Sequence, residues 1–190
     1  MNNAVQKSFV KSLSLRAMSQ VVFLIGFMGA GKSRLGKRLA KRMNFAFLDA
    51  DQEIEKANNK TVDELFAELG EDGFRTIETN WLADLNVENT VVALGGGTPC
   101  FNNNMELILQ KGKSVYLELS AKMLVDRLQS AKGIRPLIEP IKDNKDALHQ
   151  FVQEKLKERE VFYKQAHYTT RAMSLSANRL DSLIEVIEWL

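Results

Sequence analysis

Residues 20–33 read QVVFLIGFMGAGKS, and this stretch decides the fold class. Gln20 to Ile25 is a short apolar run ending at a glycine, which predicts a buried parallel strand. Gly26 to Ser33 then matches the Walker A pattern G-x-x-x-x-G-K-[ST]. Glycines in such a loop let backbone N–H groups curve around an anion at a helix N-terminus. The stretch therefore predicts a phosphate-binding loop between a strand and a helix.

Two side chains of the loop suit a nucleoside triphosphate. Lys32 supplies a mobile positive charge for the β- and γ-phosphates, and the Ser33 hydroxyl is a hard oxygen ligand for Mg²⁺. A chance glycine-rich turn is the alternative, but a strand precedes this loop and helical spacing follows it. Motors, GTPases and small-molecule kinases all share the pattern. The chain is short for a large ATPase and has no guanine-reading N-K-x-D, so a small-molecule kinase is favoured.

Strands and helices alternate along the rest of the chain. The predicted strands are residues 20–25, 45–48, 90–94, 114–119 and 168–175. Helical spacing covers residues 32–43, 72–85, 146–163 and 176–190, a helix passes through Leu124 and Leu128, and Thr61 to Glu64 has the spacing of a capping box. This order predicts a three-layer α/β/α fold with a parallel sheet of about five strands. Residues 130–142 contain Gly133, Pro136 and Pro140 and predict a mobile lid.

Composition narrows the possible partners and location. The 190 residues contain 26 basic and 24 acidic groups; residues 1–19 hold three of the bases and no acid, so the rest is close to neutral. No basic face for nucleic acid is indicated, and no apolar run reaches the ~20 residues of a membrane span. The single cysteine, Cys100, fits a reducing cytosol. We expect a cytoplasmic monomer that binds neither nucleic acid nor membrane.

The N-terminal residues invite a separate interpretation. They lack acids and contain serines, which gives a faint similarity to an organelle transit peptide. A flexible tail, or a domain that starts at Met18, explains them more simply. We expect residues 1–18 to be a flexible extension and residues 19–190 to be a single domain.

Two acids follow the second predicted strand, in Leu48-Asp49-Ala50-Asp51. In an extended segment residues i and i+2 share a side, so both carboxylates are expected to face one cleft. Ligands bind at the carboxyl end of strands in an open parallel sheet. Two acids there suit a water-bridged Mg²⁺ and a hydroxyl acceptor. The alternative is that one of them caps the next helix.

Two arginines also stand out. Arg75 and Glu78 are one helical turn apart, which alone indicates a surface ion pair worth about 0.2–0.5 kcal/mol. Arg159 falls on the apolar stripe of Leu148, Val152, Leu156 and Tyr163. A cation facing inward needs an anionic partner, and a substrate carboxylate suits the two parallel hydrogen bonds of a guanidinium. A buried acid of the protein is the alternative partner.

These motifs together resemble shikimate kinase. GFMGAGKS, then LDAD, FRTIE, LGGG, an R-P-L loop and a late Arg-x-x-x-Tyr occur in order from about Ser19 to Tyr163. The resemblance implies MgATP-dependent phosphorylation of the 3-hydroxyl of shikimate, a step toward chorismate and the aromatic amino acids. On the acceptor side it implies that Asp51 contacts the shikimate hydroxyls, that Asp49 holds Mg²⁺ through water, and that the substrate also contacts Arg75, Arg159, Gly95, Gly96 and Gly97.

On the nucleotide side the resemblance implies phosphate binding by Gly29, Ala30, Gly31, Lys32, Ser33 and Arg34. Arg127 matches a position that packs against adenine, and Arg135 is implied to come over the phosphates as the lid closes, which makes Lys32, Asp51 and Arg135 the catalytic residues. Arg34 stands where Ser or Thr is common, and the lid is slightly longer than usual. The rival interpretations are another P-loop kinase, such as a gluconate kinase, and a non-catalytic nucleotide-binding protein.

Overall fold

Five parallel strands form one sheet in the order β2-β3-β1-β4-β5. The computed structural model describes residues 20–131, 137–171 and 177–190. The strands are β1 (Val21–Ile25), β2 (Ala46–Asp49), β3 (Thr90–Ala93), β4 (Lys113–Glu118) and β5 (Tyr168–Arg171). The central strand β1 pairs with β3 and β4, in a register that places Phe23 beside Val92 and Ser114. The predicted three-layer α/β fold with a five-stranded parallel sheet is confirmed.

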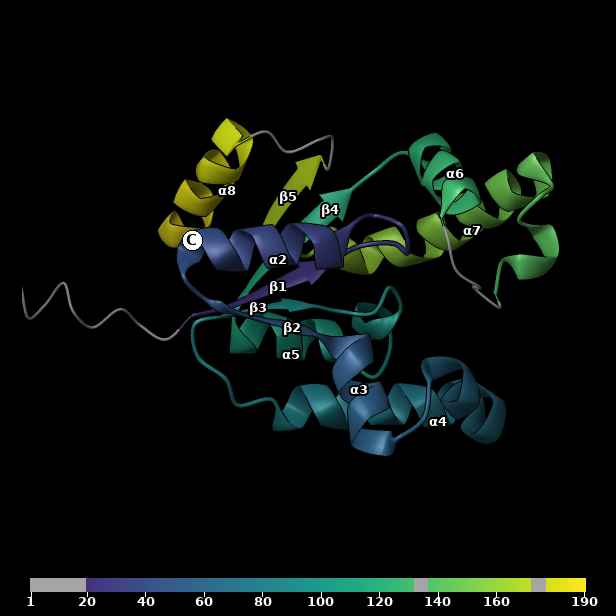
Figure 1. The fold of residues 1–190 in the computed structure, drawn as a ribbon, viewed down its shortest axis with the longest axis horizontal. Coiled ribbons are helices and arrows are strands. Elements are labelled where there is room, and N and C mark those ends of the chain that lie inside the picture. The colour runs from purple at the N-terminus through teal and green to yellow at the C-terminus, as the bar shows by residue number, and fades with distance from the viewer. Residues whose placement is uncertain (1–19, 132–136, 172–176) are drawn as a thin grey trace, which may run out of the picture.

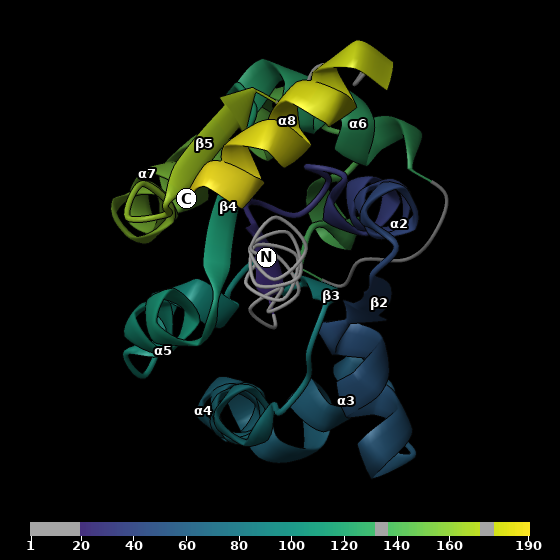
Figure 2. The same cartoon turned by 90° about the vertical axis from the view of Figure 1, so that its left-hand side faces the viewer.

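Helices cover both faces of this sheet (Figures 1 and 2). The α2 and α8 helices lie on one face, and α5 and α7 lie on the other. The described helices are α2 (Lys32–Met43), α3 (Ala50–Asn58), α4 (Val62–Asp84), α5 (Asn104–Lys111), α6 (Ala121–Ser130), α7 (Lys145–Tyr163) and α8 (Ala177–Trp189), with short 3-10 turns η1 (Thr98–Cys100) and η2 (Glu139–Ile141). None of the helices in these ranges is long and apolar enough to cross a bilayer.

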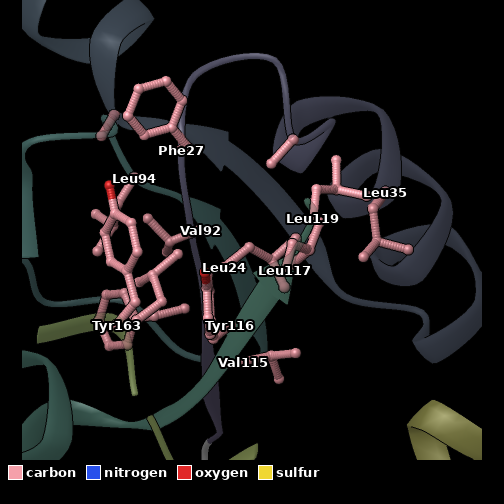
Figure 3. Close-up of a cluster of buried hydrophobic side chains, with 14 of the residues drawn as sticks. Leu24, Phe27, Leu35, Val92, Leu94, Val115, Tyr116, Leu117, Leu119 and Tyr163 are labelled. Carbon is pink, nitrogen blue, oxygen red and sulfur yellow. The ribbon is translucent and has the colours of Figure 1, made fainter. Parts of the chain in front are cut away.

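The main core lies between the sheet and its helices. Val22, Phe23, Leu24 and Ile25 of β1 are fully buried, as expected for a central strand covered on both faces. Figure 3 shows how side chains of β1, β3 and β4 meet Tyr163 at the end of α7. A second, smaller core of Ile54, Leu65 and Phe74 joins α3 to α4. These two helices extend beyond β2 and build one wall of the site described below.

The structure confirms the predicted helices in part. The capping box is present: the Thr61 hydroxyl accepts from the Glu64 N–H, and the Glu64 carboxylate accepts from the Thr61 N–H at 2.7 Å. The helix predicted over 72–85 is the second half of α4, which continues through a non-helical Gly70 at φ 70°. Helices α3 and α5 were missed because their nine and eight residues are too few to show a clear period. Residues 172–175 of the last predicted strand lie outside the described residues.

We propose that residues 1–18 lie outside the folded domain formed by residues 19–190. The sheet begins at Val21, and Gln20 is held by its own contacts, since its side-chain amide donates to the Ile187 carbonyl at 3.2 Å. A chain shortened to begin at Met18 should therefore keep its melting temperature and its activity. Thermal denaturation of both chains checks this, with a chain that begins at Phe23 and lacks the first two residues of β1 as the destabilised control. A melting temperature several degrees lower in the Met18 chain would show that the segment docks on the domain.

Candidate active site

The phosphate loop connects β1 to α2. Gly29 and Gly31 have φ of 79° and 93°, values that only glycine adopts easily, and they curl the loop toward the start of α2. The Lys32 ammonium reaches back across the loop and donates to the carbonyls of Gly26 at 2.8 Å and Phe27 at 3.2 Å. The first turn of α2 contains no acid, while Lys41 and Arg42 lie in its last turn. The loop therefore combines a helix N-terminus with a fixed cation, an arrangement that binds phosphate.

Ser33 and Asp49 bring two hard oxygen groups together. The Ser33 hydroxyl, in the first turn of α2, donates to the Asp49 carboxylate at the end of β2 over 2.5 Å. Asp49 occupies the N-cap position of α3, but its side chain makes no capping hydrogen bond. The alternative that this carboxylate serves as a helix cap is therefore wrong.

These two groups fit a magnesium ion that is held mainly by other ligands. Among the described residues no three His, Cys, Asp or Glu side chains gather as a metal site would require. Mg²⁺ commonly takes one or two protein oxygens and completes its shell with water and substrate phosphates. The Ser33 and Asp49 oxygens beside the phosphate loop match that habit.

Asp51 lies close to the same place but on a different element from the one predicted. It belongs to the first turn of α3, which begins at Ala50, so the argument from an extended segment was wrong for this residue. Burial, followed by the nearby charges of Asp49, Glu78 and Glu55, raises the Asp51 pKa to about 6, although Lys32 opposes the shift. Asp51 is therefore a carboxyl group that can exchange a proton near neutral pH, as a group facing a hydroxyl acceptor would.

A cavity of about 320 Å³ opens in front of Asp51. Asp51, Asp63, Arg75, Glu78 and Arg159 supply its charged groups, and Gly96 and Gly97 supply backbone. Its remaining lining residues are Met28, Val62, Phe66, Phe74 and Leu137. Segments distant in sequence thus meet around one small space: the phosphate loop, α3 and α4, the loop after β3, and α7. The cavity suits a compact molecule with polar substituents and an apolar face.

Arg75 forms a buried ion pair in the wall of this cavity. Arg75 and Glu78 are 6% and 2% exposed, and the guanidinium donates to Glu78 at 2.6 Å and to Glu71 at 3.0 Å. The predicted alternative of a surface pair is wrong. The ring of Phe101 lies 4.4 Å from the guanidinium carbon, and the Arg75 Nε has no hydrogen-bond partner within the described ranges. Arg75 is thus held in place by two acids of the protein at the edge of the cavity.

The charged side chains of the cavity leave room only for glycine at positions 95 and 97. A Cβ at Gly95 would lie 2.8 Å from a Glu78 oxygen and 2.9 Å from an Asp51 oxygen. A Cβ at Gly97 would lie 2.6 Å from the Arg75 guanidinium. The backbone of the LGGG segment therefore packs directly on the charged groups of the cavity.

Arg159 reaches the cavity from α7. Leu148, Val152, Leu156 and Tyr163 of the predicted stripe are buried, whereas Arg159 is half-buried and lines the cavity. Its guanidinium lies 5.5 Å above the Phe27 ring of the phosphate loop. No carboxylate in the described part of the chain forms a salt bridge with it. The alternative that Arg159 neutralises a buried acid is thus without support, and its charge faces the cavity.

Comparison with known proteins decides the family. The shikimate kinase family model matches residues 28–188. A curated shikimate kinase of Bacteroides thetaiotaomicron is 42% identical over 174 residues, covering 87% of this chain and 98% of that protein. This chain belongs to the shikimate kinase family.

Solved structures of shikimate kinases share the whole architecture. A crystal structure of shikimate kinase from Bacteroides thetaiotaomicron superposes with a TM-score of 0.81 at 39% identity, covering 90% of this chain and 97% of that one. Shikimate kinase from Acinetobacter baumannii in complex with shikimate gives 0.79 at 32% identity, covering 94% and 97%. A gluconokinase from Sinorhizobium meliloti gives 0.57 at 14% identity and shares only the fold. The gluconate kinase alternative is therefore disfavoured.

The remaining residues that the family resemblance implies lie on the nucleotide side. The Arg127 guanidinium, on α6, donates to the carbonyls of Ala30 at 3.0 Å and Gly29 at 3.4 Å and so contacts the phosphate loop itself. Arg34 is exposed in the first turn of α2. Arg135 lies outside the described residues. Of the predicted lid, Leu137 lines the cavity and Ile138 is buried in the main core.

Sequence reasoning missed the groups that hold the charged side chains in place. Thr98 donates to Glu78, and the buried Asn104 donates to the Thr98 carbonyl at 2.9 Å. The aromatic rings around Arg75 were also missed. Phe66 and Phe74 lie at helical spacing, which indicates a core, and Phe101 follows the 3-10 turn η1. Only the clustering of small and polar residues after β3 gave a signal that side chains gather there.

The raised pKa of Asp51 predicts that the stability of the folded protein depends on pH. Because the folded-state pKa of about 6 exceeds the usual 3.8, the folded state favours the protonated acid. The stabilisation of the folded state by protonated Asp51 is complete below about pH 4 and is lost as the pH rises through 6. Asp51→Asn, without nucleotide or metal, should thus be more stable than the wild type at pH 8, by on the order of 2 kcal/mol, and no more stable near pH 4.

Urea unfolding of both proteins at the two pH values measures this difference. Asp63→Asn, which removes an exposed acid from the first turn of α4, is the control for a change of charge alone. A destabilised Asp51→Asn protein at pH 8 would contradict a raised pKa.

Proposed function

We propose that this chain transfers the γ-phosphate of ATP to the 3-hydroxyl of shikimate, giving 3-phosphoshikimate and ADP. The observation that carries the proposal is the cavity beside the phosphate loop, where two guanidinium groups and one carboxyl with a raised pKa face the same space. Shikimate offers a carboxylate, three hydroxyls and a ring, and the cavity has a counterpart for each. Membership of the shikimate kinase family supports the same reaction.

The nucleotide side neutralises and orients the triphosphate. Backbone N–H groups of Gly29, Ala30 and Gly31 would surround the phosphates, and Lys32 would leave its carbonyl partners for the β- and γ-phosphates. Ser33 and, through water, Asp49 would hold Mg²⁺, which would supply positive charge to neutralise the phosphates. Arg34, Arg127 and Arg135 are proposed to complete the ATP contacts.

The acceptor side orients the hydroxyl. Asp51 would accept a hydrogen bond from the 3-hydroxyl and can take its proton as the phosphoryl group transfers. Arg75 and Arg159 would bind the substrate carboxylate, and the backbone of Gly95, Gly96 and Gly97 would contact the substrate between them. The rings of Phe66 and Phe74 would pack on the cyclohexene face. Phosphoryl transfer depends mainly on such positioning, because most of the catalysis is alignment and charge stabilisation.

We further propose that the enzyme acts as a monomer in the cytoplasm. The described residues place both sides of the cavity on one chain, so no second copy is needed to complete it. Sedimentation velocity with and without both substrates tests the monomer, and a stable dimer would contradict it.

A coupled ADP-release assay with shikimate and, separately, gluconate tests the reaction. Turnover with shikimate alone is expected. Turnover with gluconate alone would instead identify the other kinase, and no turnover with either, despite ATP binding, would favour a non-catalytic nucleotide-binding protein.

Lys32→Ala should lower kcat by on the order of 10²–10³-fold or more, since a fixed cation at the transferring phosphate is lost. The fold should persist, because Lys32 is only half-buried and bonds to loop carbonyls. Circular dichroism checks the fold and the coupled assay checks kcat. Lys41→Ala, an exposed lysine in the last turn of α2, is the control and should keep full activity. Near-native turnover of Lys32→Ala would reject the assignment of the phosphate loop.

Arg159→Lys should weaken shikimate binding about 10- to 150-fold while leaving ATP affinity almost unchanged. The charge remains, but the two parallel hydrogen bonds to a carboxylate are lost. Arg75→Lys should act similarly, and the two effects should not add if both residues bind one carboxylate. Separate titrations of shikimate and ATP measure this, with Arg171→Lys, an exposed arginine on β5, as the control. Equal weakening of both ligands together with a lower melting temperature would exclude the carboxylate contact.

A further inference from the structure

Tyr163 connects α7 to the loop that carries the glycine triplet. It is the last residue of α7 and is fully buried. Its hydroxyl donates to the Gly96 carbonyl at 2.5 Å, a contact between residues 67 positions apart. In Figure 3 its ring stands beside Leu94, with the hydroxyl oxygen toward the Phe27 end of the cluster. A buried tyrosine that served only to fill the core would need no hydroxyl.

Gly96, whose carbonyl accepts this hydrogen bond, occupies a crowded position. A Cβ at Gly96 would lie 3.2 Å from the backbone nitrogen of Met28 in the phosphate loop and 3.6 Å from the Arg159 guanidinium. Gly96 itself lines the cavity. Its peptide group therefore lies between the nucleotide side and the arginine that α7 contributes.

Tyr163 and Arg159 are one turn apart on α7. Side chains four residues apart on a helix lie on one face, so a hydroxyl fixed on Gly96 also fixes where Arg159 projects. Burial raises the pKa of the Tyr163 hydroxyl, against the smaller opposing effect of the Arg159 charge, so the hydroxyl remains a donor throughout the physiological pH range.

We propose that Tyr163 is a positioning residue for the acceptor substrate: its hydroxyl holds the Gly96 peptide group and thereby sets the distance between the glycine loop and Arg159. The proposal rests on the proposed function, because the distance it sets matters only if the acceptor lies between these two groups. Tyr163 does not itself touch the substrate. It acts by keeping two substrate contacts, on separate elements, in one arrangement.

The chain supplies a matched control in Tyr116 of β4. The two tyrosine rings are neighbours, with centroids 5.1 Å apart, and both are buried. Within the described ranges the Tyr116 hydroxyl has no hydrogen-bond partner. Removing the hydroxyl of Tyr116 thus changes the same layer of the core without affecting the Gly96 peptide.

Tyr163→Phe should raise the KM for shikimate about tenfold, the loss expected for one hydrogen bond, while the KM for ATP stays within about twofold. Tyr116→Phe should change neither constant. In an Arg159→Lys background, Tyr163→Phe should add little, because the two residues act through one arrangement. Initial-rate kinetics on the full chain, with a urea unfolding curve for each variant, measure all of these.

The outcomes separate three cases. If the wild type turns over shikimate and Tyr163→Phe has the same KM for shikimate, the inference is overturned but the proposed function stands. Three other outcomes would assign Tyr163 a purely structural role and would also overturn the inference. They are an equal increase in both KM values with lower stability, a loss of folding, and an equal effect of Tyr116→Phe. Absence of shikimate turnover in the wild type would overturn the proposed function, and this inference with it.

Discussion

The acceptor cavity depends on the buried ion pair between Arg75 and Glu78. Two opposite charges removed from water are stable only with close geometry and further hydrogen bonds, and the structure supplies both. Glu78 also accepts from Thr98, and Asn104 holds the carbonyl of that threonine. The pair thus ties α4 to the 3-10 turn that follows the glycine triplet. Loss of one partner would leave a buried charge and would release this wall of the cavity.

The two sides of the site are built by different means. Main-chain groups dominate the phosphate side, where glycines at positive φ and the start of α2 form a surface that suits any triphosphate. Side chains from three separate elements dominate the acceptor side. One fold thus combines a main-chain surface suited to phosphate with a neighbouring cavity lined mainly by side chains.

Asp51 illustrates the conflict between stability and chemistry at such a site. Its burial beside Asp49, Glu78 and Glu55 raises the cost of its negative charge, and Lys32 offsets only part of that cost. A solvent-exposed carboxyl would be cheaper to maintain but a weaker proton acceptor, because its pKa would lie far below neutral. The phosphate loop and the acid are therefore electrostatically linked through Lys32.

Much of the fold and part of the site could be predicted from local patterns. The run from Gln20 to Ile25, the loop that ends at Ser33 and the capping box at Thr61 each encode their structure within a few residues, because backbone conformation and hydrogen bonding there are local. The pattern also placed Asp49 near the end of its strand. Asp51 was placed on the wrong element, since a helix that starts directly after a strand leaves no spacer to reveal the boundary.

By itself, then, the sequence determined the order of the five strands, most of the helices, the phosphate loop and the residue types available for the cavity. Only the tertiary structure decided that the Arg75–Glu78 pair is buried, that Arg159 has no protein acid within the described residues to neutralise it, and that Tyr163 reaches Gly96. The reason is physical: burial, ion pairing and cavity shape depend on segments that lie far apart in the sequence, and no local period shows which of them will meet.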